Sequence, residues 1–121
     1  MKKGLISILF IVAMSFIVLG SGMVSAEETG YAVHYSNKFQ GKKTASKEVF
    51  DQRKLTASHK KYPFGTRVKV TNLDNNRSVV VKINDRMPTR NSNIIDVSKR
   101  AAEELGFVKQ GRAHVSLEVV D

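Results

Sequence analysis

Residues 67–83 read RVKVTNLDNNRSVVVKI and decide the class of fold. Residues 67–71 and 77–83 are rich in β-branched side chains, and in the first of these segments valine alternates with polar residues, as in a half-buried strand. Residues 72–76 lie between them and supply asparagine and aspartate, which tolerate the left-handed backbone of tight turns. The stretch therefore predicts a β-hairpin.

Segments on either side of the hairpin extend this pattern. Residues 31–35 and 113–120 alternate in polarity and predict a first and a last strand, while the polar residues 39–46 predict a loop. Ser98 is placed to cap a short helix over residues 99–105, which Gly106 would end. Strands dominate, and a closed barrel is the arrangement that leaves no strand edge exposed.

The first 26 residues differ in kind from the rest. Lys2 and Lys3 precede an apolar run over residues 5–19, and small residues ending at Ala26 follow. This pattern predicts a secretory signal peptide that is cleaved before Glu27. The alternative is a transmembrane anchor, but an apolar run of about 15 residues is shorter than the roughly 20 that span a bilayer. In both cases we expect the remainder outside the membrane.

Residues 27–121 are expected to form one domain. These 95 residues suffice for a single core, and no repeat or linker interrupts them. The chain has no cysteine, so we expect neither a disulfide nor a thiolate zinc site, and the mature protein would not be a lipoprotein.

The charge of this domain restricts its partners. Lys2 and Lys3 are the only charged residues of the first segment, so the domain keeps 18 basic and 11 acidic side chains, a net charge of +7. Such a balance favours a polyanionic partner, unless it serves only solubility. Export excludes nucleic acid as the natural partner and favours anionic wall polymers or anionic lipid.

Several polar motifs hold residue types that a barrel does not require. They read TASKEVFD over residues 44–51, LTASHK over 55–60, PFGT over 63–66 and INDRMP over 83–88. In this order, and together with VTNL at 70–73 and IID at 94–96, they resemble the rare-lipoprotein-A family. The resemblance extends from about Gly30 to Val119.

This resemblance implies a fold, an activity and a pair of catalytic residues. The fold is a six-stranded double-psi β-barrel with one or two short helices, shared with expansins. The activity is that of a lytic transglycosylase, which cleaves peptidoglycan glycan strands, preferably those stripped of stem peptides, to anhydro-muramic ends. Carried over by position, the acidic pair of the family falls on Glu48 and Asp85.

The chemistry of glycan cleavage agrees with such a pair. An acid must protonate the departing oxygen, and a carboxyl with an ordinary pKa of about 4 holds its proton near neutrality only if burial or another carboxylate raises that pKa. We expect burial to do this for Asp85, unless Arg86 turns its guanidinium inward. Glu48 would stabilise positive charge on the sugar or orient the attacking muramic hydroxyl. The structural alternatives are a turn-forming role for Asp85 and simple exposure for Glu48.

Further side chains are expected to contact the substrate. Asp51 and Asp96 would line the same cleft, unless they only hold loops by bonding backbone amides. His59 would donate to a sugar hydroxyl, although a lone histidine is more often structural. Aromatic rings can stack on sugars, and the candidates are Tyr31, Tyr35, Phe39, Phe50, Tyr62 and Phe64. Of these, Tyr35 is the one expected to bind substrate, and Phe50 and Phe64 are expected in the core instead. The remaining substrate-binding candidates are Thr44 and Arg86.

The chain departs from the family pattern at three places. Residues 34–36 lack the tryptophan of the family's Ser-Trp-Tyr-Gly segment, and Lys47 and Met87 stand where the family has glycine. Glycine permits unusual backbone angles and close approach. We therefore expect the two replacements to shift Glu48 or Asp85, or to narrow the groove.

Other classes of site have no sequence signal. No histidine lies at metal-ligand spacing from another ligand, and no phosphate loop or nucleophile elbow occurs, so we expect no metal and no cofactor. The leading hypothesis is a secreted, wall-associated, monomeric lytic transglycosylase that acts on peptidoglycan glycan strands. The alternatives are a non-catalytic, expansin-like module that binds or loosens glycan, and an exported protein that binds a partner protein or an anionic wall polymer through lysine pairs such as Lys42 and Lys43.

Overall fold

The computed structural model describes residues 27–120, so the predicted signal peptide lies outside the described residues. The 3-10 helix η2 (Asn37–Phe39) and the α-helix α2 (Lys99–Leu105) accompany the strands. Within residues 27–120 no helix is both long and apolar enough to cross a membrane. The strands are β1 (Glu28–His34), β2 (Thr56–His59), β3 (Arg67–Asn72), β4 (Ser78–Arg86), β5 (Ile95–Val97) and β6 (Arg112–Val119).

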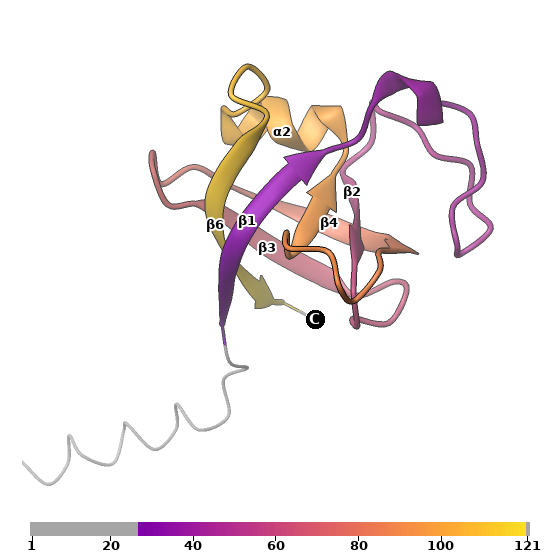
Figure 1. The fold of residues 1–121 in the computed structure, drawn as a ribbon, viewed down its shortest axis with the longest axis horizontal. Coiled ribbons are helices and arrows are strands. Elements are labelled where there is room, and N and C mark those ends of the chain that lie inside the picture. Colours follow the sequence, from indigo (N-terminus) through magenta and orange to yellow (C-terminus); the bar gives the residue numbers. More distant parts are fainter. Residues whose placement is uncertain (1–26, 121) are drawn as a thin grey trace, which may run out of the picture.

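These strands close into one barrel. Their order around it is β1-β5-β2-β4-β3-β6, and the β1–β5 and β2–β4 pairs are parallel whereas the other neighbours are antiparallel. The first and last strands, β1 and β6, lie side by side in Figure 1 and are paired from Glu28 with Leu117 to Val33 with Arg112. The expected mainly β fold, a six-stranded double-psi barrel with short helices, is confirmed.

The predicted hairpin is formed by β3 and β4. In its turn the side-chain oxygen of Asn72 accepts a hydrogen bond from the backbone of Asp74 at 2.9 Å, and its amide donates to the carbonyl of Leu105 at 2.9 Å. Asn76 adopts the left-handed region with φ of 62°. β4 continues to Arg86, beyond the predicted end at Ile83, so that Asp85 lies within the strand rather than after it.

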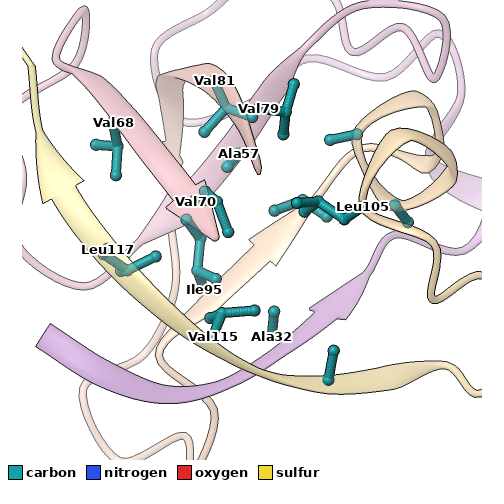
Figure 2. Packing of buried hydrophobic residues seen from close by; sticks show 14 of the residues in the cluster. Ala32, Ala57, Val68, Val70, Val79, Val81, Ile95, Leu105, Val115 and Leu117 are labelled. Carbon is teal, nitrogen blue, oxygen red and sulfur yellow. The ribbon is translucent and has the colours of Figure 1, made fainter. Parts of the chain in front are cut away.

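The barrel interior is filled mainly by aliphatic side chains from alternate positions of the strands (Figure 2). In the hairpin, Val68 pairs with Val81 and Val70 with Val79, and all four side chains are buried. Each fully buried side chain of this kind contributes about 1.5–3 kcal/mol relative to an exposed one. β2 and β4, which carry parts of the polar motifs at 55–60 and 83–88, contribute Ala57 and Ile83 to this core.

Helix α2 has the predicted bounds. The Ser98 hydroxyl oxygen accepts a hydrogen bond from the backbone of Ala101 at 3.3 Å, and Gly106 ends the helix with φ of 79°. The helix packs against β4 and β1 and lies across one end of the barrel in Figure 1. Gln52 lies in the loop before β2 and binds the start of the helix. Its side-chain oxygen accepts from the backbone of Lys99 at 2.7 Å, and its backbone carbonyl accepts from the backbone of Arg100 at 3.0 Å.

Two strands were not predicted from sequence. All four residues of β2 are buried, and β2 pairs with β4 on one side and β5 on the other. A strand enclosed in this way shows no polar–apolar alternation. β5 has only three residues, too few for a period to be visible.

Candidate functional site

A tight hairpin turn positions the first acidic residue. The backbone of Lys47 donates to the carbonyl of Thr44 at 2.9 Å, and that of Thr44 donates to Glu48 at 2.8 Å, while Lys43 and Val49 form a β-bridge. The third turn residue, Lys47, has φ of 80°. This is a three-residue hairpin loop that ends in a left-handed residue, the position that favours glycine. Lys47 therefore holds a backbone conformation that glycine would adopt with less strain.

The turn docks on the end of β4. The backbone of Ser46 donates to the carbonyl of Asn84 at 3.3 Å, and the backbone of Ala45 donates to the Asp85 carboxylate at 2.9 Å. The Thr44 hydroxyl lies 3.0 Å from that of Ser46 and so braces the same turn. These contacts bring two segments that are far apart in sequence to one edge of the barrel.

Glu48 is an ionised carboxylate at this edge. Its two oxygens accept from Nζ of Lys82 at 2.9 Å and from the amide of Asn84 at 3.1 Å. The hydrogen bond from Lys82, followed by that from Asn84, lowers the pKa of Glu48 below its ordinary value. The side chain is 46% exposed, so a ligand can reach it. A cleft of about 320 Å³ begins here and is lined by Glu48, Val49, Asp51, Lys54, Thr56, Lys82 and Asn84.

Asp85 accepts three hydrogen bonds. The donors are the Tyr35 hydroxyl at 2.6 Å and the backbone amides of Ala45 and Arg86, each at 2.9 Å. Two of these donors come from distant segments, so Asp85 does more than shape a local turn. The Arg86 guanidinium donates instead to the carbonyl of His59 at 3.0 Å and lies over the Phe64 ring, with Cζ 4.6 Å from the ring centroid.

Asp96 lies on β5, which is separated from β4 by β2. Ser58 of β2 is paired with Asp85 on one side and with Asp96 on the other, so the three residues form one row across the sheet. Burial is the main cause that raises the pKa of Asp96 to about 6; nearby His34 lowers it and Asp85 raises it. One Asp96 oxygen is buried without a hydrogen-bond partner among the described residues.

Tyr35 serves the site through its hydroxyl, which corrects the expectation that its ring stacks on sugar. The residue is only 7% exposed, and its ring stacks on Phe50 at a centroid distance of 4.2 Å. Burial, followed by the hydrogen bond to Asp85, raises the pKa of the phenol. The predicted core position of Phe50 is confirmed at 1% exposure, whereas that of Phe64 is wrong because its ring is 44% exposed beneath the Arg86 guanidinium.

His59 does not join the cluster, which corrects its expected role as a donor to sugar. It is 3% exposed, and its Nδ1 accepts from the backbone amides of Lys61 and Tyr62 at 3.0 and 3.1 Å. Nε2 must therefore carry the proton and donate to Glu28 at 2.9 Å. Desolvation lowers the pKa of His59, and its ring stacks on Tyr62 at 3.7 Å. Both ring nitrogens are occupied within the protein.

Asp51 lines the cleft but is also bound locally. Its oxygens accept from Nε and Nη2 of Arg53 at 3.0 and 3.1 Å and from the Arg53 backbone at 3.0 Å. These hydrogen bonds hold the pKa of Asp51 well below its usual range. Asp51 therefore combines the two roles that the sequence left open, a loop-holding one and a place beside Glu48.

Sequence reasoning missed three residues of the site. Lys82 and Asn84 stand two apart on β4 and hold Glu48 together, a spacing that strand alternation places on one face. Ser58 gave no signal because β2 itself was not recognised. Among residues 27–120 no group of three or more histidine and acidic side chains is arranged to hold a metal.

The topology and the polar edge together define a double-psi β-barrel protein with clustered carboxylates. Residues 27–117 match the family model described as lytic transglycolase, and the chain belongs to that family.

Two curated relatives carry the name endolytic peptidoglycan transglycosylase RlpA. The protein of Neisseria meningitidis serogroup A is 48% identical over 93 residues, which cover 77% of this chain and 39% of that protein. The one from Treponema pallidum, named as probable, is 41% identical over 121 residues, covering all of this chain and 38% of that protein. The chain thus spans about two fifths of the length of these relatives.

Solved structures share the fold at low sequence identity. The Streptomyces papain inhibitor aligns with a TM-score of 0.65 and 20% identity over 81% of this chain and 97% of that one. An expansin variant of Clavibacter michiganensis, solved with cellohexaose, aligns with a TM-score of 0.63 and 18% identity over 79% of this chain and 51% of that one. At these identities the likeness concerns the fold.

Proposed function

We propose that this domain is an exported peptidoglycan lytic transglycosylase in which Asp85 and Glu48 are the catalytic residues. The observation that carries the proposal is the docking of the 44–48 turn on β4, which places both carboxylates at one edge of the barrel. Membership of the lytic transglycolase family and the names of the relatives support the same activity.

The environment of Glu48 suits an electrostatic role. The lowered pKa of Glu48 keeps it negative across the neutral range, as needed to stabilise the positive charge that grows on the sugar ring. Asp85 would act as the acid that protonates the departing oxygen and then as the base for the muramic hydroxyl. Because that hydroxyl belongs to the substrate, no water has to be activated.

The cleft beside Glu48 is the proposed glycan-binding surface. Val49 is 57% exposed and offers an apolar contact to a sugar face, while Asp51 and Lys54 offer polar partners. Thr44 braces the 44–48 turn, and Arg86 binds the carbonyl of His59 beside Asp85. Both are proposed to position the glycan strand rather than to take part in the reaction. Export, processing before Glu27 and retention on anionic wall polymers by the basic charge complete the proposal.

One observation favours a second candidate, a non-catalytic expansin-like glycan binder. Lys82 forms an ion pair with Glu48 at 2.9 Å and so neutralises the charge meant for the sugar. Both groups are nearly half exposed, and such pairs contribute only about 0–1 kcal/mol in water. A substrate can therefore displace Lys82, and the transglycosylase remains the first candidate.

The deciding experiment is mass spectrometry of soluble products from peptidoglycan and from amidase-stripped glycan strands. The purified domain is compared with its Asp85→Asn and Glu48→Gln variants. Asp74→Asn is the matched control, because Asp74 is exposed in the β3–β4 turn. We expect anhydro-muramic products from the native domain and the control, and a loss of roughly a hundredfold or more in both test variants.

The outcomes separate the two candidates. If the native domain releases no anhydro product but still binds the wall in a sedimentation assay, the enzyme proposal fails and the glycan binder replaces it. If Asp85→Asn releases product at the native rate, Asp85 is not the acid.

A further inference from the structure

The row of residues across β4, β2 and β5 contains two acidic side chains that bracket one serine. Ser58 is the register partner of Asp85 in the parallel β2–β4 pair and of Asp96 in the antiparallel β2–β5 pair. Cross-strand partners project to the same side of a sheet, and the β2–β4 register shifts between Ala57 and Ser58, just before this row. Asp85 and Asp96 therefore flank Ser58 on one surface.

The Tyr35 hydroxyl binds one end of this row, because it donates to the Asp85 carboxylate at 2.6 Å.

Asp96 is in an environment that disfavours a second negative charge. One of its oxygens is buried and lacks a partner among the described residues. The groups that act on it electrostatically are His34 from β1, which favours its ionised form, and Asp85 from β4, which opposes it. The charges of both carboxylates also contribute to raising the pKa of Tyr35. An ionised Asp96 would thus be a poorly solvated charge in the same row as another carboxylate, with Ser58 between them.

We propose that Asp85 and Asp96 form a coupled pair that holds one proton between them, with Asp96 as a positioning residue that keeps a proton available to Asp85. The inference rests on the proposed function of Asp85 as acid and base. Two interacting carboxyls titrate as a pair, so the loss of one changes the charge state of the other. Asp96 acts through Asp85 and does not contact the glycan.

The pair supports a balanced reaction. Protonated Asp85 gives its proton to the glycosidic oxygen as the bond to the anomeric carbon breaks, and the departing strand leaves with a hydroxyl. The muramic hydroxyl oxygen then bonds to the anomeric carbon, and its proton returns to Asp85. The enzyme ends with the proton it started with, so the pair is ready for the next cleavage without an added reactant.

The first test measures titration without any substrate. The domain is prepared with isotope-labelled aspartate carboxyl carbons, and their NMR shifts are followed from about pH 3 to about pH 8 in the native protein and in Asp85→Asn. We expect Asp96 to titrate near neutral pH in the native protein and at least half a unit lower in Asp85→Asn, roughly the effect of removing a neighbouring like charge. Asp74→Asn is the control and leaves Asp96 unchanged. An Asp96 midpoint that is the same in all three proteins overturns the pair.

The second test measures the pH dependence of product release. In Asp96→Asn we expect the alkaline limb of the activity profile to move to lower pH by about one unit, while binding to the wall is retained. An unmoved limb would show a structural role only. Complete loss at every pH, in a folded variant that still binds, would make Asp96 the direct acid and also overturn the proposal.

These two tests separate the inference from the proposed function. If the native domain releases no product, the transglycosylase proposal fails, yet the NMR titration still reports whether the carboxyls are coupled. If product is released and no coupling is found, the inference alone fails.

Discussion

Asp96→Asn is expected to stabilise the domain near neutral pH and to leave its stability unchanged in acid. The pKa of Asp96 is raised from 3.8 to about 6, chiefly by burial. Each unit of such a shift corresponds to about 1.4 kcal/mol, so ionised Asp96 costs the folded state up to about 3 kcal/mol. Asparagine has the same shape and no charge to bury, so it avoids this cost.

The sign of the effect fixes the pH window. Because the folded-state pKa lies above the unfolded one, the contribution of Asp96 is fully favourable below about pH 4 and is lost as the pH rises through about 6. The difference between variant and native protein should therefore be near zero at about pH 4 and should reach its full size above about pH 7.

Urea unfolding at several pH values measures this difference. The unfolding midpoint of Asp96→Asn should exceed that of the native protein by a margin that grows as the pH rises, while the m-values of the two proteins stay equal. Asp74→Asn, in an exposed turn, supplies the control. A stability gain that is equal at acid and neutral pH, or that is largest in acid, would refute the argument that the Asp96 charge is poorly solvated.

Three further predictions concern neighbouring residues. Lys47→Gly should raise the free energy of unfolding by about 1 kcal/mol, because Lys47 has φ of 80°, and a thermal midpoint that does not rise would contradict this. Lys82→Gln should move the pKa of Glu48 up toward its ordinary value, as followed by NMR, since Lys82 is the main cause of the lowering; an unmoved midpoint would be evidence against the ion pair. His59→Ala should cost about 2–4 kcal/mol in urea unfolding, because both ring nitrogens are bonded, while the folded variant keeps its affinity for the wall; weakened binding at unchanged stability would restore a role in the site.

Local patterns were sufficient for much of the fold. The β3–β4 hairpin and helix α2 follow from alternation, turn residues and caps within one short segment each, and both lie where the sequence places them. The barrel as a whole required the family resemblance, because the parallel β2–β4 pairing joins residues that no local rule connects.

The site was only partly accessible to sequence reasoning. The place of Glu48 and Asp85 follows from their motifs, but which carboxyl is desolvated depends on what covers it, and burial raises the pKa of Asp96. Tyr35 and His59 are aromatic and polar at once, so their residue types fit a sugar-binding surface and a buried hydrogen-bonded position equally well. In the structure both side chains are buried.

The seam between β1 and β6 has a consequence for the order of events during biogenesis. β6 is hydrogen-bonded to both β1 and β3, so residues 112–119 complete two of the six strand pairings of the barrel. Glu28, at the start of β1, pairs with Leu117 near the end of β6. Pairings this distant along the chain form slowly, and only after both partners are available. A nascent chain therefore cannot close the barrel until residues 112–119 have been synthesised.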